Sequence, residues 1–256
     1  MSTRIRLAMS AAACCVLLAG AACAPEQVAD GRPKTQRFTV DGPTLTIDSD
    51  LGSVALVAAP ADNRTDGHRI KVTRRFDAAR VGGTVGNEVR QTSPDTLQLN
   101  TRCSGVVVSC SVSYRIEVPA DLAVDLTADD GHVRAEDFTA PLKARVTDGN
   151  VNLERLSGRV RLEVERGSVR AEHLSADRVH ADVSDGYLVM GFDRPPGHLG
   201  SRSVRGNSTL RLPDTDYRIG TDLTRSRAKI GVRRAADSEH RIDAAVTDGR
   251  LRITHR

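Results

Sequence analysis

The sequence predicts an all-β protein, and within that class a right-handed, β-helix-like solenoid whose coils contain 18–20 residues. The first observation is a recurring glycine, with successive spacings of 18, 18, 19 and 20 residues. These glycines are Gly131, Gly149, Gly167, Gly186 and Gly206. The second is that aliphatic and charged residues alternate on both sides of each glycine, which is typical of half-buried strands. The third is that aromatic residues make up only 3% of the chain, so Val, Leu, Ile and Ala must build the core.

Every repeat has the same inward positions. Residues seven, five and three places before each glycine, and two and four places after it, are mostly aliphatic. Around Gly167 these residues are Val160, Leu162, Val164, Val169 and Ala171. The frame also fits Gly52 and Gly249, and one further unit is degenerate, with Ser201 and Ser203 at inward positions. We therefore expect aliphatic columns inside the stack and charged columns outside it.

Each recurring glycine is expected to allow a turn between two strands, because glycine accepts a positive φ without a Cβ clash. A β-sandwich or a hairpin meander would show the same alternation. Charge favours stacked coils. The residue before the glycine reads Asp148, Arg166, Asp185 and Arg205 in successive units, and the residue four places before it reads Arg145, Glu163, Asp182 and Arg202. Opposite charges would therefore be neighbours if coils stack about 4.8 Å apart.

The N-terminus has the pattern of an export signal over residues 1–22. Arg4 and Arg6 precede an uncharged run, residues 7–22, which is shorter than the about 20 residues that span a bilayer. Small residues before Cys23 resemble the bacterial lipobox, in which the cysteine thiol is acylated and becomes the new N-terminus. Gly20 departs from that pattern, because Leu, Val or Ile is expected there. Ordinary signal-peptidase cleavage, which would give a secreted protein, is the alternative.

The rest of the chain is expected to be a polar tether, residues 23–36, followed by a single domain, residues 37–256. Two prolines favour an extended tether. Residues 38–118 alternate in several places and are expected to form longer, less regular strands, with turns at Asp62-Asn63 and Gly82-Gly83. A loop is expected over residues 193–197.

Cysteine usage agrees with export. After Cys23 only Cys103 and Cys110 remain, and an even pair in an exported chain predicts one disulfide. The pair does not have C-x-x-C spacing and is not accompanied by a second Cys or His pair, so a metal or redox role is disfavoured.

Composition argues against several functions. The net charge of +4 falls to +2 without the two arginines of the signal, and aromatic side chains that would stack on bases are few, so no nucleic-acid partner is expected. We assign no catalytic residue, no metal ligand and no cofactor. The region 200–235 is basic; a solvated strand face is the favoured interpretation, and a surface for anionic lipid or cell-wall polymer is the alternative. Its arginines are Arg202, Arg205, Arg211, Arg218, Arg225, Arg227, Arg233 and Arg234.

The lipobox-like start, the cysteine pair, Glu117-Val-Pro-Ala-Asp121 and the glycine-centred repeats together resemble a bacterial family known as putative adhesins. The resemblance covers residues 40–256 and implies a β-helical exported protein. The family has no assigned catalytic residues to carry over.

The expected function is therefore non-enzymatic. We expect a cell-envelope lipoprotein at the outer face of the cytoplasmic membrane, held by a lipid on Cys23 and acting as an adhesin-like scaffold or binding module. A cell-wall polymer or an envelope protein is the expected partner. The alternatives are a β-helical carbohydrate-active enzyme and a sensory lipoprotein that works with a membrane partner.

Overall fold

A computed structural model describes residues 25–60 and 67–256. The expected signal peptide, Cys23 and the expected turn at Asp62-Asn63 lie outside the described residues. The described part is all-β. Its first nine strands are β1 (Glu26–Ala29), β2 (Lys34–Val40), β3 (Thr44–Leu51), β4 (Ser53–Ala59), β5 (His68–Arg80), β6 (Thr84–Ser93), β7 (Thr96–Ser104), β8 (Val107–Pro119) and β9 (Ala123–Glu136). The other nine are β10 (Leu142–Glu154), β11 (Val160–Arg166), β12 (Val169–Leu174), β13 (Arg178–Phe192), β14 (His198–Leu212), β15 (Asp216–Leu223), β16 (Ser226–Ile230), β17 (Arg233–Arg234) and β18 (Arg241–His255). Across the described ranges, no helix has the length and apolar character needed to cross a bilayer.

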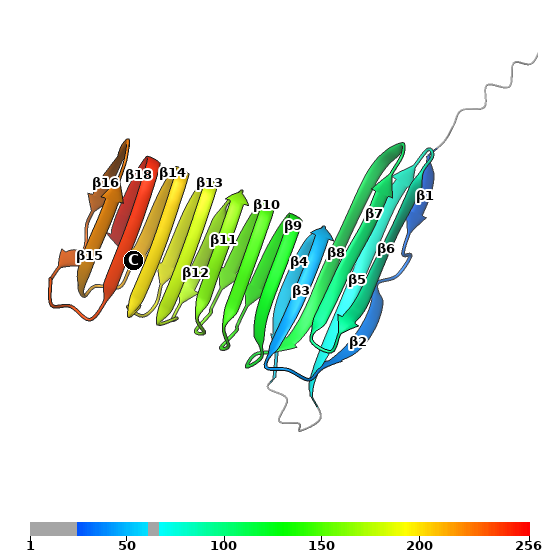
Figure 1. The fold of residues 1–256 in the computed structure, drawn as a ribbon, viewed down its shortest axis with the longest axis horizontal. Helices are drawn as coiled ribbons and strands as arrows, with labels where there is room; N and C mark the ends of the chain where they lie inside the picture. Colours follow the sequence, from blue (N-terminus) through cyan, green and yellow to red (C-terminus); the bar gives the residue numbers. More distant parts are fainter. Residues whose placement is uncertain (1–24, 61–66) are drawn as a thin grey trace, which may run out of the picture.

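Successive repeats pair in parallel and in register, forming the row of strands in Figure 1. Between β9 and β10, Val124 is paired with Leu142 and Gly131 with Gly149. In β9 and β10 the strand continues through the glycine, whereas at Gly167 it is interrupted between β11 and β12. The expected turn is in each case a corner between two strand segments of the same coil. A hairpin meander requires antiparallel pairing across the glycine, and that alternative is therefore wrong for residues 123–255.

The glycine corners stack directly on one another. Their φ angles lie between 142° at Gly131 and 153° at Gly149, a region that L-residues with a side chain rarely adopt. A Cβ placed on Gly167 would overlap the carbonyl oxygen of Gly149 and lie 2.7 Å from its carbonyl carbon. Glycine is thus required at this corner for two reasons, the backbone angle and the close approach of the neighbouring coil.

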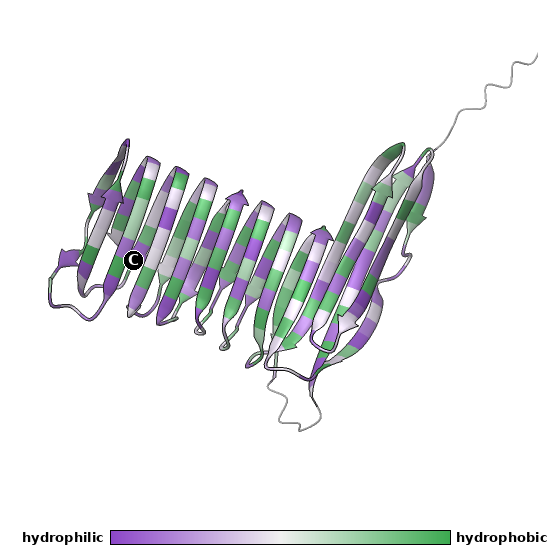
Figure 2. Cartoon of the chain, in the orientation of Figure 1, coloured by the Kyte–Doolittle hydropathy of each residue, from purple (hydrophilic) through white to green (hydrophobic). Residues whose placement is uncertain are grey.

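The interior contains the residues that the alternation predicted. Figure 2 shows hydrophobic and hydrophilic residues alternating along the strands. The inward aliphatic residues around Gly167 are at most 2% exposed; they are Val160, Leu162, Val164, Val169 and Ala171. Full burial of a Val or Leu side chain contributes about 1.5–3 kcal/mol. Equivalent buried aliphatic residues repeat in β9, β10, β13 and β18.

We call the residues before the glycine of a coil its first arm and those after the glycine its second arm. In three coils a second corner follows the second arm. Asp137, Arg155 and His173 have φ angles of 65°, 55° and 58°, although none is glycine. Each is followed by a buried Phe or Leu, as at Phe138. The Arg155 Nε donates a hydrogen bond of 2.6 Å to Asp137 Oδ1, which holds two of these corners together. Sequence reasoning missed these left-handed corners because non-glycine residues occupy them.

At one end of the stack the chain order and the spatial order differ. The Gly52 unit, β3 and β4, pairs with β9 on one side and with β7 and β8 on the other. Strands β5 and β6 pair antiparallel with β8 and β7, and close that end. Strands β1 and β2 pair antiparallel with β5, so much of the expected tether lies in strands (Figure 1).

At the other end, the last strand of the chain lies inside the stack. β18 pairs with β14 on one side and with β15 and β16 on the other. Gly249 is therefore stacked on Gly206, although the two are 43 residues apart in sequence. The intervening unit, β15 to β17, forms the outermost coil (Figure 1).

The degenerate unit places hydroxyl groups inside the core. Ser201, Ser203 and Ser208 are at most 5% exposed, and their Oγ atoms have no hydrogen-bond partner among the described residues. Ser203 is paired between Val183 and Val246 of the neighbouring coils. An unpaired buried hydroxyl costs about 1–3 kcal/mol, so this coil is a weak layer of the stack.

Candidate functional site

Charged ladders cover the outer surface beside the glycine corners. Arg166 forms an ion pair with Asp148, and Arg205 forms one with Asp185. These pairs confirm the alternation of charge that the sequence predicts. The hydrogen bond from Arg166 lowers the pKa of Asp148, which keeps the carboxylate ionised well into acid.

A second ladder runs parallel to the first. Arg145 Nη2 lies 2.9 Å from Glu163 Oε2, and Arg202 Nε lies 3.9 Å from Asp182 Oδ1. The hydrogen bonds from Arg161 and Arg145 lower the pKa of Glu163. The charges on this face therefore neutralise one another and leave little net field for a ligand.

The basic region expected over 200–235 is not one surface. Five of its eight arginines have an acidic partner within 4.0 Å; these are Arg202, Arg205, Arg211, Arg225 and Arg233. Within the described ranges, Arg218, Arg227 and Arg234 have no such partner. The expectation of a single basic face is wrong, because the strands of this region point their arginines to different sides of the stack.

A different cluster forms where β16 and β18 meet. Arg227 is paired with Arg250 across the two strands, and Lys229 with Arg252. All four side chains are exposed, and none lies within 4.0 Å of an acidic side chain of the described residues. We call these four residues the basic patch.

The basic patch has a regular spacing set by the strands. Paired residues lie about 4.8 Å apart across the sheet, and alternate residues about 6.7 Å apart along a strand. Like charges directly opposite each other destabilise a sheet. Four cations in this arrangement thus cost stability that no ion pair within 4.0 Å among the described residues offsets, which is the condition expected of a surface that holds an external anion.

Uncharged polar residues border the basic patch on the side of β14. Asn207 is paired with Arg250, and Thr209 with Arg252. One strand further, Tyr187 of β13 is paired with Asn207 and is 59% exposed. These amide, hydroxyl and phenol groups extend the patch with side chains that can donate hydrogen bonds to an oxygen-rich ligand.

A hollow of about 400 Å³ lies on the opposite arm of the same coils. Gly200 and Gly220 supply no side chain, and the side chains of His180 and Asp243 lie over them: a Cβ on Gly200 would be 2.6 Å from His180 Nδ1, and one on Gly220 would be 3.0 Å from Asp243 Oδ1. His198 Nε2 lies 3.0 Å from Asp243 Oδ2, and Arg241 Nε donates to the same oxygen at 2.7 Å. Burial opposes ionisation of Asp243, but these two hydrogen bonds, together with the charges of Arg241 and His198, outweigh it and lower the pKa of Asp243.

Within the part of the chain that the structure describes, no group of three or more His, Cys, Asp or Glu side chains could hold a metal ion.

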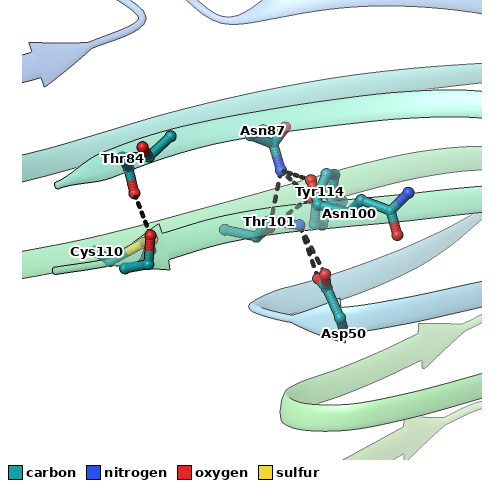
Figure 3. Close-up of a disulfide and its surroundings, with 9 residues drawn as sticks. Asp50, Thr84, Asn87, Asn100, Thr101, Cys110 and Tyr114 are labelled. Atoms are coloured by element: carbon teal, nitrogen blue, oxygen red, sulfur yellow. Dashed lines mark hydrogen bonds between the residues drawn. A yellow bond between two sulfur atoms is a disulfide. The ribbon is translucent and has the colours of Figure 1, made fainter.

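The cysteine pair belongs to the structural end of the molecule. Cys103 of β7 and Cys110 of β8 form the expected disulfide, with their Cα atoms 6.4 Å apart (Figure 3). Nearby, the Asn87 side chain donates hydrogen bonds to Thr101 and Tyr114, and the Thr101 N–H donates to Asp50.

This network joins β6, β7, β8 and β3 across the end of the stack. Burial raises the pKa of Tyr114, which keeps its hydroxyl protonated as a hydrogen-bonding group. Sequence reasoning did not find the network, because its members come from four separate strands.

Comparisons with known proteins find weak structural similarity and no sequence match. No protein-family model matches the sequence, and no curated protein matches it. Among solved structures, a putative adhesin from Bacteroides fragilis is 15% identical, with a TM-score of 0.46 over 88% of this chain and 98% of that chain. A putative cell adhesion protein from Clostridium sporogenes is 12% identical, with a TM-score of 0.38 over 88% of this chain and 100% of that chain. Similarity at this level does not indicate a shared function.

Proposed function

We propose that this protein is a non-enzymatic, exported binding module of the bacterial cell envelope that holds an anionic polymer on its basic patch. The observation that carries the proposal is the set of four exposed cations on β16 and β18 with no acidic neighbour in the described chain. Most cations elsewhere on the stack are paired with carboxylates, as Arg205 is with Asp185.

A polymer with regularly spaced anions fits this geometry better than a compact anion. The four cations form a grid of about 4.8 Å by 6.7 Å, so positive charges are regularly spaced both between the two strands and along each strand. Polyol phosphates and uronic acid polymers carry one anionic group per repeating unit, and each unit would meet one cation. Exposed ion contacts are individually weak, about 0.2–1 kcal/mol, so affinity must come from several contacts at once.

We further propose that the stack is a β-solenoid that serves as a rigid spacer. Strand β1 lies at one end of the stack, and the basic patch lies at the other (Figure 1). A lipid on Cys23, three residues before Glu26 of β1, would hold the first end close to the membrane and direct the basic patch away from it. Mass spectrometry of the mature N-terminus tests this anchoring; a diacylglyceryl adduct on Cys23 is expected, and an unmodified N-terminus after Ala21 would overturn it.

A carbohydrate-active enzyme on a β-helix would need carboxylates that are free to act on a sugar. Along both ladders the carboxylates have cationic partners, as in the pair of Glu163 with Arg145. Carboxylates held ionised in this way cannot serve as a general acid at neutral pH. The binding module is therefore the function that the described residues support best.

Calorimetry at two salt concentrations tests the proposal. It measures the binding of poly(glycerol phosphate) and of polygalacturonate, with neutral dextran as the blank. We expect binding that weakens with salt, and a loss of at least about fivefold in Arg250→Gln/Arg252→Gln, from two lost contacts. The matched control is Arg159→Gln/Arg234→Gln, which removes the same charge from exposed arginines outside the basic patch. Equal loss in both variants, or no binding of either polymer, would overturn the proposal. Binding to anionic lipid vesicles in place of both polymers would do the same.

A further inference from the structure

Strand β15 is the last strand of the sheet formed by the coil residues before the glycines, and one of its edges is open. Residues 218–223 pair with β18 on one side, whereas β17 covers only residues 216 and 217. The N–H of Arg218 donates to His240, and the N–H of Thr224 donates to Val246, so the even-numbered residues direct their backbone groups at β18. By the alternation of a strand, the backbone groups of Ile219 and Thr221 point the other way. Open strand edges of this kind are templates for pairing with another chain.

The edge of β15 lacks two of the usual protections against pairing. It has no proline and no lysine, and Gly220 at its centre supplies no side chain. Leu223 is 38% exposed, and Ile219 is only half-buried. The edge of β16 differs, because Arg227 and Lys229 give it two charges of the same sign.

The charges on β15 complement a second copy of the same strand. Arg218 and Asp222 lie two residues on either side of Gly220, on the same face of the sheet, because both numbers are even. Both are exposed, and neither has an ion-pair partner within 4.0 Å in the described chain. One cation and one anion placed symmetrically about a glycine are self-complementary under a two-fold rotation.

We propose that β15 pairs antiparallel with β15 of a second copy of this chain, about a two-fold axis at Gly220. Arg218 then faces Asp222 of the second copy, and Asp222 faces its Arg218, which forms two intermolecular ion pairs. Ile219 faces Thr221 of the second copy, and the outward backbone groups of these residues form about four hydrogen bonds.

Neighbouring registers do not give the same match. Centring the axis on Ile219 would place Asp222 opposite Asp216, which is repulsive. Centring it on Thr221 would place Arg218 opposite Thr224 and Asp222 opposite Gly220, without an ion pair. Charge therefore selects the register at Gly220, as cross-strand pairs do within a sheet.

Sedimentation velocity over a range of protein concentrations tests the pairing by a charge swap. We expect a monomer–dimer equilibrium in the wild type. Arg218→Asp or Asp222→Arg alone turns both ion pairs into repulsions and weakens the dimer by about tenfold or more, whereas Arg218→Asp/Asp222→Arg restores it. A monomer at every concentration, or a dimer that the single changes leave intact, would overturn the proposal.

Three further variants serve as controls for the charge swap. Thr221→Pro removes an N–H that points away from β18, so the fold is retained in far-UV circular dichroism while the dimer is lost. Arg159→Asp changes the charge by the same amount far from the edge, and we expect the wild-type equilibrium. In Arg250→Gln/Arg252→Gln the dimer is retained even if polymer binding is lost, which separates a failure of the proposed function from a failure of the pairing.

Discussion

Replacing Gly167 by alanine tests whether the stacked glycine corners hold the coils together. The residue has a φ of 145°, and a strained backbone angle of this kind costs about 1–3 kcal/mol for a residue with a side chain. The added Cβ would lie 2.7 Å from the carbonyl carbon of Gly149, so the two coils must also move apart, at a further cost of about 1–3 kcal/mol. We expect Gly167→Ala to lower the free energy of unfolding by about 2–6 kcal/mol.

The matched control is Gly86→Ala in β6. Gly86 has no neighbouring atom within 4 Å of an added Cβ, and its φ is outside the positive region. Alanine there restricts the unfolded chain and stabilises the protein by up to about 1 kcal/mol. Urea unfolding followed by far-UV circular dichroism gives both midpoints. A cost below about 1 kcal/mol for Gly167→Ala, or equal costs for both variants, would refute the stacked-corner argument.

Three other changes probe the ladder, the polar core layer and the disulfide. Arg166→Ala raises the pKa of Asp148 toward its ordinary value of 3.8. In the wild type the ion pair stabilises the fold above that pH, and this contribution is lost as the pH falls through the lowered pKa. Carboxyl NMR titrations should therefore show a higher midpoint for Asp148 in the variant. Ser203→Val fills a column that holds valine in the adjacent coils and raises the unfolding free energy by about 1–2 kcal/mol; a lower urea midpoint would contradict this. Cys103→Ser/Cys110→Ser opens an eight-residue ring and lowers stability by about 2.5 kcal/mol, less any strain, so an unchanged melting temperature would rule out a stabilising bridge.

Local pattern was sufficient to predict the phase of the strands. Leu162 faces inward and Glu163 outward because period-two alternation leaves only one face that an aliphatic side chain can bury. The register of the ladder pairs also followed from the sequence, since equal spacing from the glycine places Arg166 beside Asp148. The disulfide needed only the cysteine count and the export signal.

The roles of the corners did not follow from local pattern. Gly167 was expected to allow a turn between two strands, and the sequence left open whether that turn was a corner of a coil or the tip of a hairpin; it is a corner of a coil whose strands pair with neighbours 18 or more residues away. Alternation is the same in parallel and antiparallel pairs, so only long-range hydrogen bonding distinguishes them. Asp137 and Arg155 adopt left-handed angles that the stacked neighbours impose, and their residue types gave no sign of it.

The candidate site was only partly visible in the sequence. Arg227 and Lys229 belong to the basic stretch 200–235, but Arg250 and Arg252 complete the basic patch because β18 is inserted beside β16. Arg202 and Arg225 belong to the same stretch and yet are neutralised by acids of neighbouring strands. A linear count of charge cannot find a patch whose members are brought together by strand order.

The sequence by itself determined which side chains enter the core, where glycine is needed and which cysteines are joined, because each of these depends on local spacing and on the chemistry of single residues. Only the tertiary structure decided the order of the coils at the two ends, with β18 inside β15 and with the Gly52 unit between β8 and β9. The reason is that a coil with this repeat offers nearly equivalent edges on both sides, so placement depends on the summed packing and hydrogen bonding of distant segments.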